Sequence, residues 1–128
     1  MRKVLVDTSA WIDYFRDGPG LVSELMEKAL DADEVVLCGI VEMELIRGLH
    51  NKEKTKVLPL LSALPYVDIE RNDFVLAGQW MAALRGRGVT VSSTDSLIAT
   101  VCKKHDLSIL TLDKDFKYFD EVKVYGLQ

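Results

Sequence analysis

Residues 3–7, Lys-Val-Leu-Val-Asp, and residues 107–113, Leu-Ser-Ile-Leu-Thr-Leu-Asp, decide the fold of this 128-residue chain. Each stretch is a short run of mostly aliphatic residues that ends in an aspartate. Such runs are typical of strands that are buried on both faces of a parallel sheet. Helical patterns separate these runs from the other strand-like runs along the chain. The sequence therefore predicts an α/β fold with a mostly parallel central sheet.

The rest of the chain continues this alternation. Further strands are predicted at 35–38, at 66–69 as an edge strand, and at 122–125. Helices are predicted at 8–16, 21–31, 41–49, 52–64, 72–87 and 95–105, where apolar residues recur at helical spacing. Gly18-Pro19-Gly20 separates the first two helices, and Pro59 is a position where the fourth could kink. Without repeats, low-complexity stretches or linkers, the chain is predicted to be one domain over residues 1–128.

The composition excludes several classes of protein. Apolar residues make up 48% of the chain, but no run of them is long enough to span a membrane. The start of the chain lacks the apolar length of a signal peptide, so we expect a cytoplasmic protein in which Cys38 and Cys102 are buried free thiols. A net charge of −4 argues against a nucleic-acid coat protein, but not against an enzyme whose metal ions supply positive charge.

Four acidic residues stand at expected strand or helix boundaries, namely Asp7, Glu44, Asp95 and Asp113. The carboxyl ends of parallel strands share one edge of a sheet, which places Asp7 at that edge and Glu44 near it. A helix of about ten residues descends roughly 15 Å, and about five strand residues climb back roughly 16 Å. Asp95 and Asp113 therefore return to the same level. We expect all four acids at one rim of the sheet.

Gathering these carboxylates has an electrostatic cost. At an effective dielectric near 20, two like charges about 6 Å apart cost roughly 3 kcal/mol. A divalent cation removes this cost, and hydrolysis of phosphate esters is the chemistry that most often uses such a site. The four acids therefore indicate metal-dependent phosphoester hydrolysis.

Each acid also has a purely structural interpretation. Asp7 and Asp95 would fit as helix caps, and Asp113 as the start of a turn. Glu42 and Glu44 point about 200° apart on a helix, and helical geometry does not choose between them. The coincidence of four acids, rather than any one of them, favours the metal site.

Several neighbouring residues have weaker signals. Asp115 fits a solvated turn residue better than a fifth ligand. His50 and His105 are expected to cap the C-terminal ends of helices, because imidazole is a poor match to magnesium. Hydroxyl side chains stand beside the acids, where they would orient carboxylates, hold water or cap helices: Thr8, Ser9, Thr94 and Thr111.

The chain resembles the PIN-domain family, specifically the VapC-type toxins of toxin–antitoxin pairs. The matching motifs are VDTSAWIDYF at 6–15, ELIRG at 44–48, TDSLIAT at 94–100 and LTLDKDF at 110–116. They occur in the family's order and cover essentially the whole chain. The resemblance implies a three-layer sandwich with helices on both sides of the sheet. It assigns Asp7, Glu44, Asp95 and Asp113 to the family's acidic quartet, and so favours Glu44 over Glu42.

The same resemblance implies an endoribonuclease that uses Mg²⁺ or Mn²⁺. Asp7 and Asp95 would hold the metal mainly, with Glu44 and Asp113 binding it directly or through water. It also implies a cognate VapB-like antitoxin and a homodimer. Two alternatives stay open: a catalytically silent PIN fold that binds RNA or protein, and a receiver-like domain that is phosphorylated on an aspartate. A receiver needs an acidic pair after its first strand, whereas Asp7 stands between Val6 and Thr8.

The first predicted helix carries more apolar surface than one core-facing stripe requires. Its apolar residues are Trp11, Ile12, Tyr14 and Phe15. We expect some of these to line a groove beside the acids, together with Leu45, Ile46 and Leu49 of the third helix. Such a groove suits an amphipathic helix of the antitoxin, and a basic tail after that helix would reach the acids. Ordinary core packing is the alternative for each of these residues.

Overall fold

The structure, a computed structural model, describes residues 2–16 and 20–126. The strands are β1 (Val4–Val6), β2 (Val35–Cys38), β3 (Tyr66–Val67) and β4 (Ser108–Leu110). The helices are α1 (Thr8–Arg16), α2 (Leu21–Asp31), α3 (Gly39–Gly48), α4 (Asn51–Ser62), α5 (Arg71–Gly86) and α6 (Ser93–His105), and a 3₁₀ helix, η1, covers Lys114–Tyr118. The sequence predicted a break between α1 and α2 at Gly18-Pro19-Gly20, and two residues of this break, Gly18 and Pro19, lie outside the described residues.

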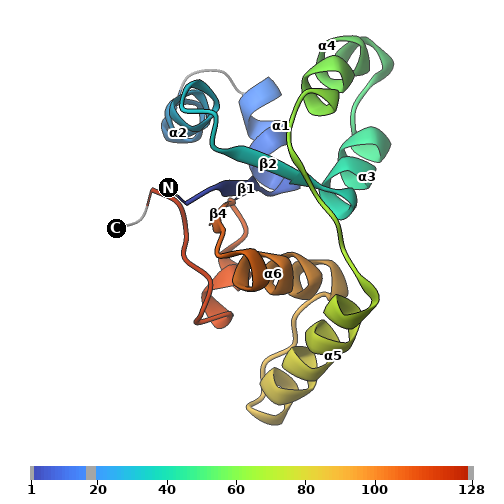
Figure 1. The fold of residues 1–128 in the computed structure, drawn as a ribbon, viewed down its shortest axis with the longest axis vertical. Helices are drawn as coiled ribbons and strands as arrows, with labels where there is room; N and C mark the ends of the chain where they lie inside the picture. The colour runs from blue at the N-terminus through green and yellow to red at the C-terminus, as the bar shows by residue number, and fades with distance from the viewer. Residues whose placement is uncertain (1, 17–19, 127–128) are drawn as a thin grey trace.

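The four strands form a parallel sheet in the order β3-β2-β1-β4. β1 lies between β2 and β4, with Val4 opposite both Val35 and Ser108. In Figure 1, α1 to α4 occupy the upper half of the molecule and α5 and α6 the lower half, with β1, β2 and β4 between them. The predicted three-layer α/β sandwich is confirmed, and the sheet is parallel throughout. β3 lies at its edge, as expected.

The last predicted strand is wrong. Within 122–125, only Val124 pairs with a strand, through a single bridge to Ile109. The Tyr125 N–H donates to the Ile109 carbonyl at 2.7 Å. The extended backbone stops there because Gly126 adopts a φ of +84°, which a side-chain-bearing residue rarely takes. The segment is therefore too short to form a fifth strand.

α6 is the most deeply buried helix and carries one of the four acids in its first turn. Every residue from Ser96 to Cys102 is buried. The Ser96 and Thr100 hydroxyls donate to carbonyls four residues earlier, at 2.8 and 2.7 Å, which satisfies both groups inside the core. Cys38 and Cys102 are buried free thiols, as expected. Rigid packing of α6 fixes the position of its N-terminal turn.

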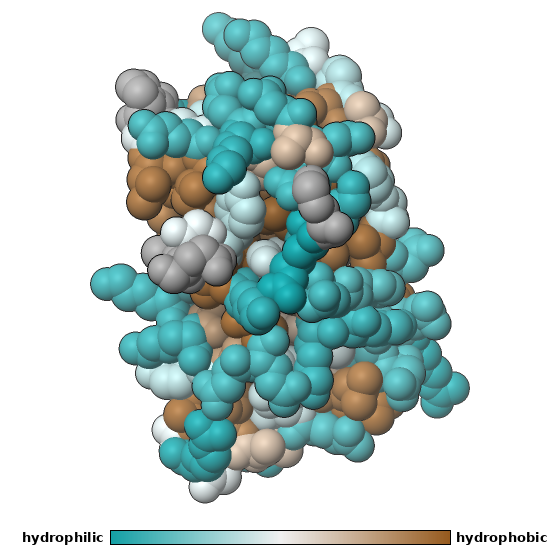
Figure 2. Space-filling view, turned by 60° about the vertical axis from the view of Figure 1, so that its left-hand side comes forward, coloured by the Kyte–Doolittle hydropathy of each residue, from teal (hydrophilic) through white to brown (hydrophobic). Residues whose placement is uncertain are grey.

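The exterior is largely hydrophilic on the side turned forward in Figure 2, with hydrophobic residues breaking the surface in separate places. Among the described residues, no helix combines the length and the apolar character needed to cross a membrane.

Candidate metal centre

Asp7 follows β1 directly and is only 6% exposed. Its backbone N–H donates to the Leu110 carbonyl at 2.9 Å, which ties it to the end of β4. Its carboxylate Oδ2 accepts from the Thr111 hydroxyl at 2.8 Å and from the Ser9 hydroxyl at 3.2 Å. Asp7 is therefore held at the carboxyl edge of two adjacent strands, with its side chain oriented by two hydroxyls.

The same two hydroxyls also hold the loop after β4. Ser9 Oγ accepts from the Leu112 N–H at 3.0 Å, and Thr111 Oγ1 accepts from the Asp113 N–H at 2.9 Å. The two hydroxyl oxygens lie 3.3 Å apart. Thr111 thus connects the side chain of one predicted acid, Asp7, to the backbone of another, Asp113. The sequence pattern was compatible with orienting, water-holding or capping roles for these hydroxyls, and the structure shows that both orient the Asp7 carboxylate.

Glu44 lies on α3 and accepts from the Thr8 hydroxyl through Oε1 at 2.9 Å. Glu42 instead lies at the Tyr66 hydroxyl. The pKa of Tyr66 is raised mainly by burial, and the negative charge of Glu42 raises it further. The two glutamates therefore point to different places. Only Glu44 faces the start of α1, where it adds to the raised pKa of Asp7.

Asp95 lies in the first turn of α6, and its N–H donates to the Ser92 hydroxyl at 3.1 Å. Asp95, Asp113 and Asp115 each offer a carboxylate oxygen, and these oxygens lie within 4.8 Å of one another. The Asp115 N–H donates to Asp113 Oδ1 at 2.9 Å. Asp115 is therefore in the turn that the sequence predicted, but its carboxylate also reaches the cluster, which the sequence did not favour.

Burial and neighbouring carboxylates together raise the pKa of two of these acids. Burial is the main cause that raises the pKa of Asp7, and the charge of Glu44 adds to it. The pKa of Asp95 is raised to about 7, mainly by burial, then by the hydrogen bond and negative charge of Asp113, with Asp7 contributing less. Burial is thus the first cause of both raised pKa values, and the neighbouring carboxylates raise them further.

The four predicted acids thus lie near one another, although among the described residues the carboxylates whose oxygens lie within 4.8 Å of one another are those of Asp95, Asp113 and Asp115. We call Asp7, Glu44, Asp95 and Asp113 the acidic site. Its side chains come from β1, α3, α6 and the loop after β4, and Asp7 interacts electrostatically with both Glu44 and Asp95. The available donors are carboxylate and hydroxyl oxygens, which are the ligands of hard divalent cations. The residues present fit Mg²⁺ or Mn²⁺.

The PIN domain family matches residues 4–122. This chain belongs to the PIN-domain family. It is 32% identical over 118 residues to the VapC ribonuclease Mb1587 of Mycobacterium bovis, covering 88% of each protein. It is 28% identical over 127 residues to ribonuclease VapC1 of Methanocaldococcus jannaschii, covering 98% of this chain and 85% of that one.

The fold is also found in solved structures. A chain of the VapBC2 structure from Rickettsia felis, bound to a DNA fragment from their promoter, superposes with a TM-score of 0.78. The two chains are 21% identical, and the match covers 94% of this chain and 96% of the other. Membership of the PIN-domain family removes the receiver-like alternative.

The predicted groove beside α1 has different walls from those expected. Trp11 and Leu45 are 0% exposed and Leu49 is 4% exposed, so these three belong to the core. They are covered because α1 packs against α2 and α3 at once, which needs a wide apolar surface. Tyr14 and Phe15 do line a groove, of about 720 Å³. Its other walls come from α2 and α4, through Gly20, Ser23, Glu24, Glu27, Lys56 and Leu60.

His50 has a different role from the predicted one. α3 ends at Gly48 and is followed by Leu49, whose backbone is extended, so His50 falls at the N-terminal cap of α4 rather than at the end of α3. The His50 N–H donates to Glu53 Oε1 at 2.9 Å. His105 is the last residue of α6, at a helix end as expected.

Proposed function

We propose that this protein is a Mg²⁺- or Mn²⁺-dependent endoribonuclease that acts in the cytoplasm as the toxin of a VapBC-type pair. The observation that carries the proposal is the convergence of Asp7, Glu44, Asp95 and Asp113 in a set of oxygen donors. The two relatives described above are named as ribonucleases, which supports RNA as the substrate.

The acidic site would hold the cation mainly through Asp7 and Asp95, with Glu44 and Asp113 binding directly or through water. When bound, the cation supplies Lewis-acid stabilisation of the phosphate and lowers the pKa of a water. Thr111 keeps the Asp7 carboxylate oriented for this task. The carboxyl proton of Asp95, which its hydrogen bond shares with Asp113, has to leave before both side chains can act as anionic ligands.

The direct test is an assay of purified, antitoxin-free protein on total RNA, with Mg²⁺ or with EDTA, followed by mapping of the cut ends. We expect cleavage in Mg²⁺ and none in EDTA. Equal cleavage in EDTA would exclude the metal mechanism. Intact RNA in Mg²⁺ and in Mn²⁺ would instead favour the catalytically silent binding module.

The groove lined by Tyr14, Phe15 and Leu60 is the proposed seat of a VapB-like antitoxin. Its α2 wall carries Glu24 and Glu27, and its α4 wall carries Lys56. An amphipathic helix with an apolar stripe between a basic and an acidic edge would complement these walls. A basic tail after that helix would reach the acidic site and compete with the cation.

This docking proposal is tested with surface charges rather than with Trp11. Truncating the buried Trp11 to alanine should cost about 3–5 kcal/mol of folding stability, which would obscure any binding effect. Lys56→Glu should weaken the antitoxin complex, whereas Lys28→Glu, elsewhere on α2, should not. Deleting the antitoxin's basic tail should restore nuclease activity more than it weakens binding. Unchanged affinity for Lys56→Glu would place the antitoxin on another face.

A homodimer is the second proposed assembly. Large apolar side chains on α3, β3 and α5 are 41% to 58% exposed: Met43, Ile46, Tyr66, Phe74 and Val75. Apolar residues at this exposure are candidates for a protein interface. Light scattering at micromolar concentration should give a dimer for the natural chain and a monomer for Phe74→Glu. A monomer for the natural chain across that range would reject the proposal.

A further inference from the structure

A shallow pocket of about 290 Å³ opens directly beside the acidic site. Two of its lining residues belong to the acidic site or support it. Thr111 orients the Asp7 carboxylate, and Asp113 is one of the four acids. A molecule that lies in this pocket therefore also lies next to any group held at the acidic site. The other lining residues have a different chemistry, because they are two lysines and three apolar side chains.

The lysines, Lys114 and Lys117, are both exposed and stand three positions apart on η1. A 3₁₀ helix has three residues per turn, so the two side chains emerge from the same side of it. Within residues 2–16 and 20–126, neither lysine has a carboxylate at ion-pair distance. Lys103 and Lys104, by contrast, are already paired with carboxylates. Lys117 Nζ lies over the Tyr118 ring, 5.1 Å from its centroid, a contact that leaves its charge without a counter-ion. η1 therefore offers positive charge to an anionic ligand, in a chain of net charge −4.

The apolar part of the pocket is formed by Leu112, Phe116 and Val124. Leu112, which immediately precedes Asp113, is 51% exposed, whereas Phe116 is only 1% exposed. The Phe116 ring is therefore too covered to stack on a base, and the accessible contact is aliphatic. Such a surface suits a sugar or the flat side of a base, with weak preference among bases.

We propose that this pocket is a subsite for the RNA nucleotide next to the scissile phosphate. Lys114 and Lys117 contact backbone phosphates beside the cut, and Leu112 packs against the adjoining sugar or base. The inference rests on the proposed ribonuclease function, because the pocket would bind a second part of the RNA strand whose scissile phosphate lies at the acidic site. A single strand is the form of RNA that fits, since its bases and sugars are accessible to an aliphatic side chain.

The first test uses the double variant Lys114→Gln/Lys117→Gln with a fluorescently labelled single-stranded RNA. We expect KM to rise while kcat and Mn²⁺ affinity stay close to those of the natural chain. Each lost phosphate contact should lower the slope of log KM against log salt by about 0.7, so the double variant should lose up to about 1.4. The matched control is Lys28→Gln/Lys52→Gln, two exposed lysines on helices that carry none of the four acids.

The second test replaces the aliphatic contact. Leu112→Ala should raise KM for the single-stranded RNA about equally for all nucleotides beside the cut, and should leave the salt dependence unchanged. A double lysine variant with the natural KM and salt slope, or a control variant with the same losses, would overturn the proposal.

Equilibrium binding of the same RNA, measured by fluorescence anisotropy, distinguishes failure of the ribonuclease function from failure of the RNA subsite. If the natural chain binds RNA without cutting it, the ribonuclease function fails. In that case a weaker complex in the double variant still supports the pocket as an RNA site, and an unchanged complex refutes it. If the natural chain neither binds nor cuts RNA, both proposals fail.

Discussion

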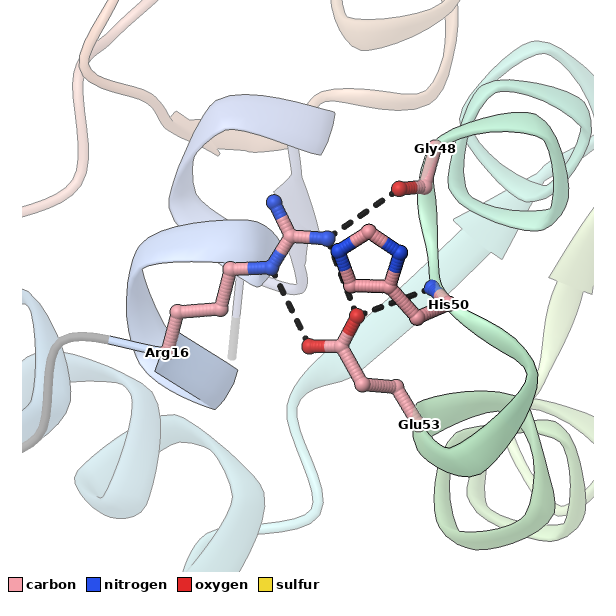
Figure 3. Close-up of polar contacts among 4 residues, drawn as sticks. All are labelled: Arg16, Gly48, His50 and Glu53. Carbon is pink, nitrogen blue, oxygen red and sulfur yellow. Dashed lines mark hydrogen bonds and ion pairs between the residues drawn. The ribbon is translucent and has the colours of Figure 1, made fainter.

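Two groups of polar residues in this molecule place carboxylates in opposite surroundings. In the acidic site, Asp95 is hydrogen-bonded to Asp113, and Asp7 interacts electrostatically with Asp95 and Glu44. In the second cluster, which joins the end of α1 to the corner between α3 and α4, Glu53 faces Arg16, with Gly48 and His50 beside it (Figure 3). We call these four residues the Arg16–Glu53 cluster.

The Arg16–Glu53 cluster contains its own cation. Arg16 donates to both carboxylate oxygens of Glu53, at 2.9 and 3.1 Å, and to the Gly48 carbonyl at 3.1 Å (Figure 3). Hydrogen bonds from Arg16, followed by the one from the His50 N–H, lower the pKa of Glu53 to about 2. The pKa of Asp95, in contrast, is raised to about 7.

The difference indicates which cluster is structural and which is kept for a ligand. Glu53 is satisfied by groups of the protein itself and ties two parts of the fold together. Asp95 has mainly burial and other carboxylates around it, so its charged form needs a cation from solution. The comparison makes opposite predictions for neutralising a carboxylate in each cluster.

The largest expected difference is in catalysis. Asp7→Asn should lower RNA cleavage by more than about 100-fold, because even the loss of an outer-shell partner of a metal typically costs 10- to 100-fold. Glu53→Gln should leave kcat close to that of the natural chain. Both variants are assayed in Mg²⁺ on the same RNA. A large loss in Glu53→Gln at unchanged folding would mean that the two clusters are not functionally separate.

A smaller loss is expected when the hydroxyl that orients Asp7 is removed. Thr111→Val keeps the shape of the side chain but removes its bond to Asp7, so cleavage should fall by about 10- to 100-fold. Thr111→Ser keeps the hydroxyl and should recover most of the activity. A valine variant as active as the serine variant would show that this hydrogen bond has no role in catalysis.

Stability without metal should change in opposite directions. Asp95→Asn relieves repulsion among carboxylates, so the melting temperature in EDTA should hold or rise. Glu53→Gln removes the partner of Arg16, so the melting temperature should fall. Unfolding of Asp95→Asn below the stability of the natural chain would identify Asp95 as a structural cap of α6.

The pH dependence of stability in EDTA should separate the clusters further. The pKa of Asp95 is raised from 3.8 to about 7 in the folded chain, which therefore keeps a proton that the unfolded chain loses first. Its contribution to stability is present below about pH 4 and is lost as pH rises toward 7. The pKa of Glu53 is lowered from 4.5 to about 2, so its contribution is present above 4.5 and is lost as pH falls toward 2.

Urea unfolding across this pH range measures both effects. Asp95→Asn should flatten the decline above pH 4, and Glu53→Gln should flatten the decline below 4.5. A natural chain and an Asp95→Asn variant with the same slope above pH 4 would contradict the raised pKa of Asp95.

Much of the fold was predictable because buried strands and amphipathic helices leave clear patterns. The runs that became β1 and β2, and the aspartate after β1, were recognisable from local sequence. The placement of Asp7, Asp95 and Asp113 at one rim followed from strand and helix geometry, while the choice of Glu44 over Glu42 and RNA as the substrate came only from resemblance to a family.

Other features depend on contacts that local patterns do not contain. An apolar stripe shows that a helix packs, but not against how many neighbours, so the sequence left open whether Trp11 lines a groove or belongs to the core, where the structure has it. Val122–Tyr125 had the composition of a strand, yet Gly126 ends the extended backbone after one bridge. The Thr111 bond to Asp7 joins residues 104 positions apart, which only the folded chain reveals.

Calorimetric titration of Mn²⁺ into the natural chain, Asp95→Asn and Glu53→Gln tests most directly whether the acidic site is built for a cation from solution. The natural chain and Glu53→Gln should bind Mn²⁺ with the same affinity, releasing protons near pH 7 as the Asp95 carboxyl ionises. Asp95→Asn should bind much more weakly and release fewer protons. No binding by the natural chain, or equal affinity in all three proteins, would contradict the assignment of the acidic site as a metal centre.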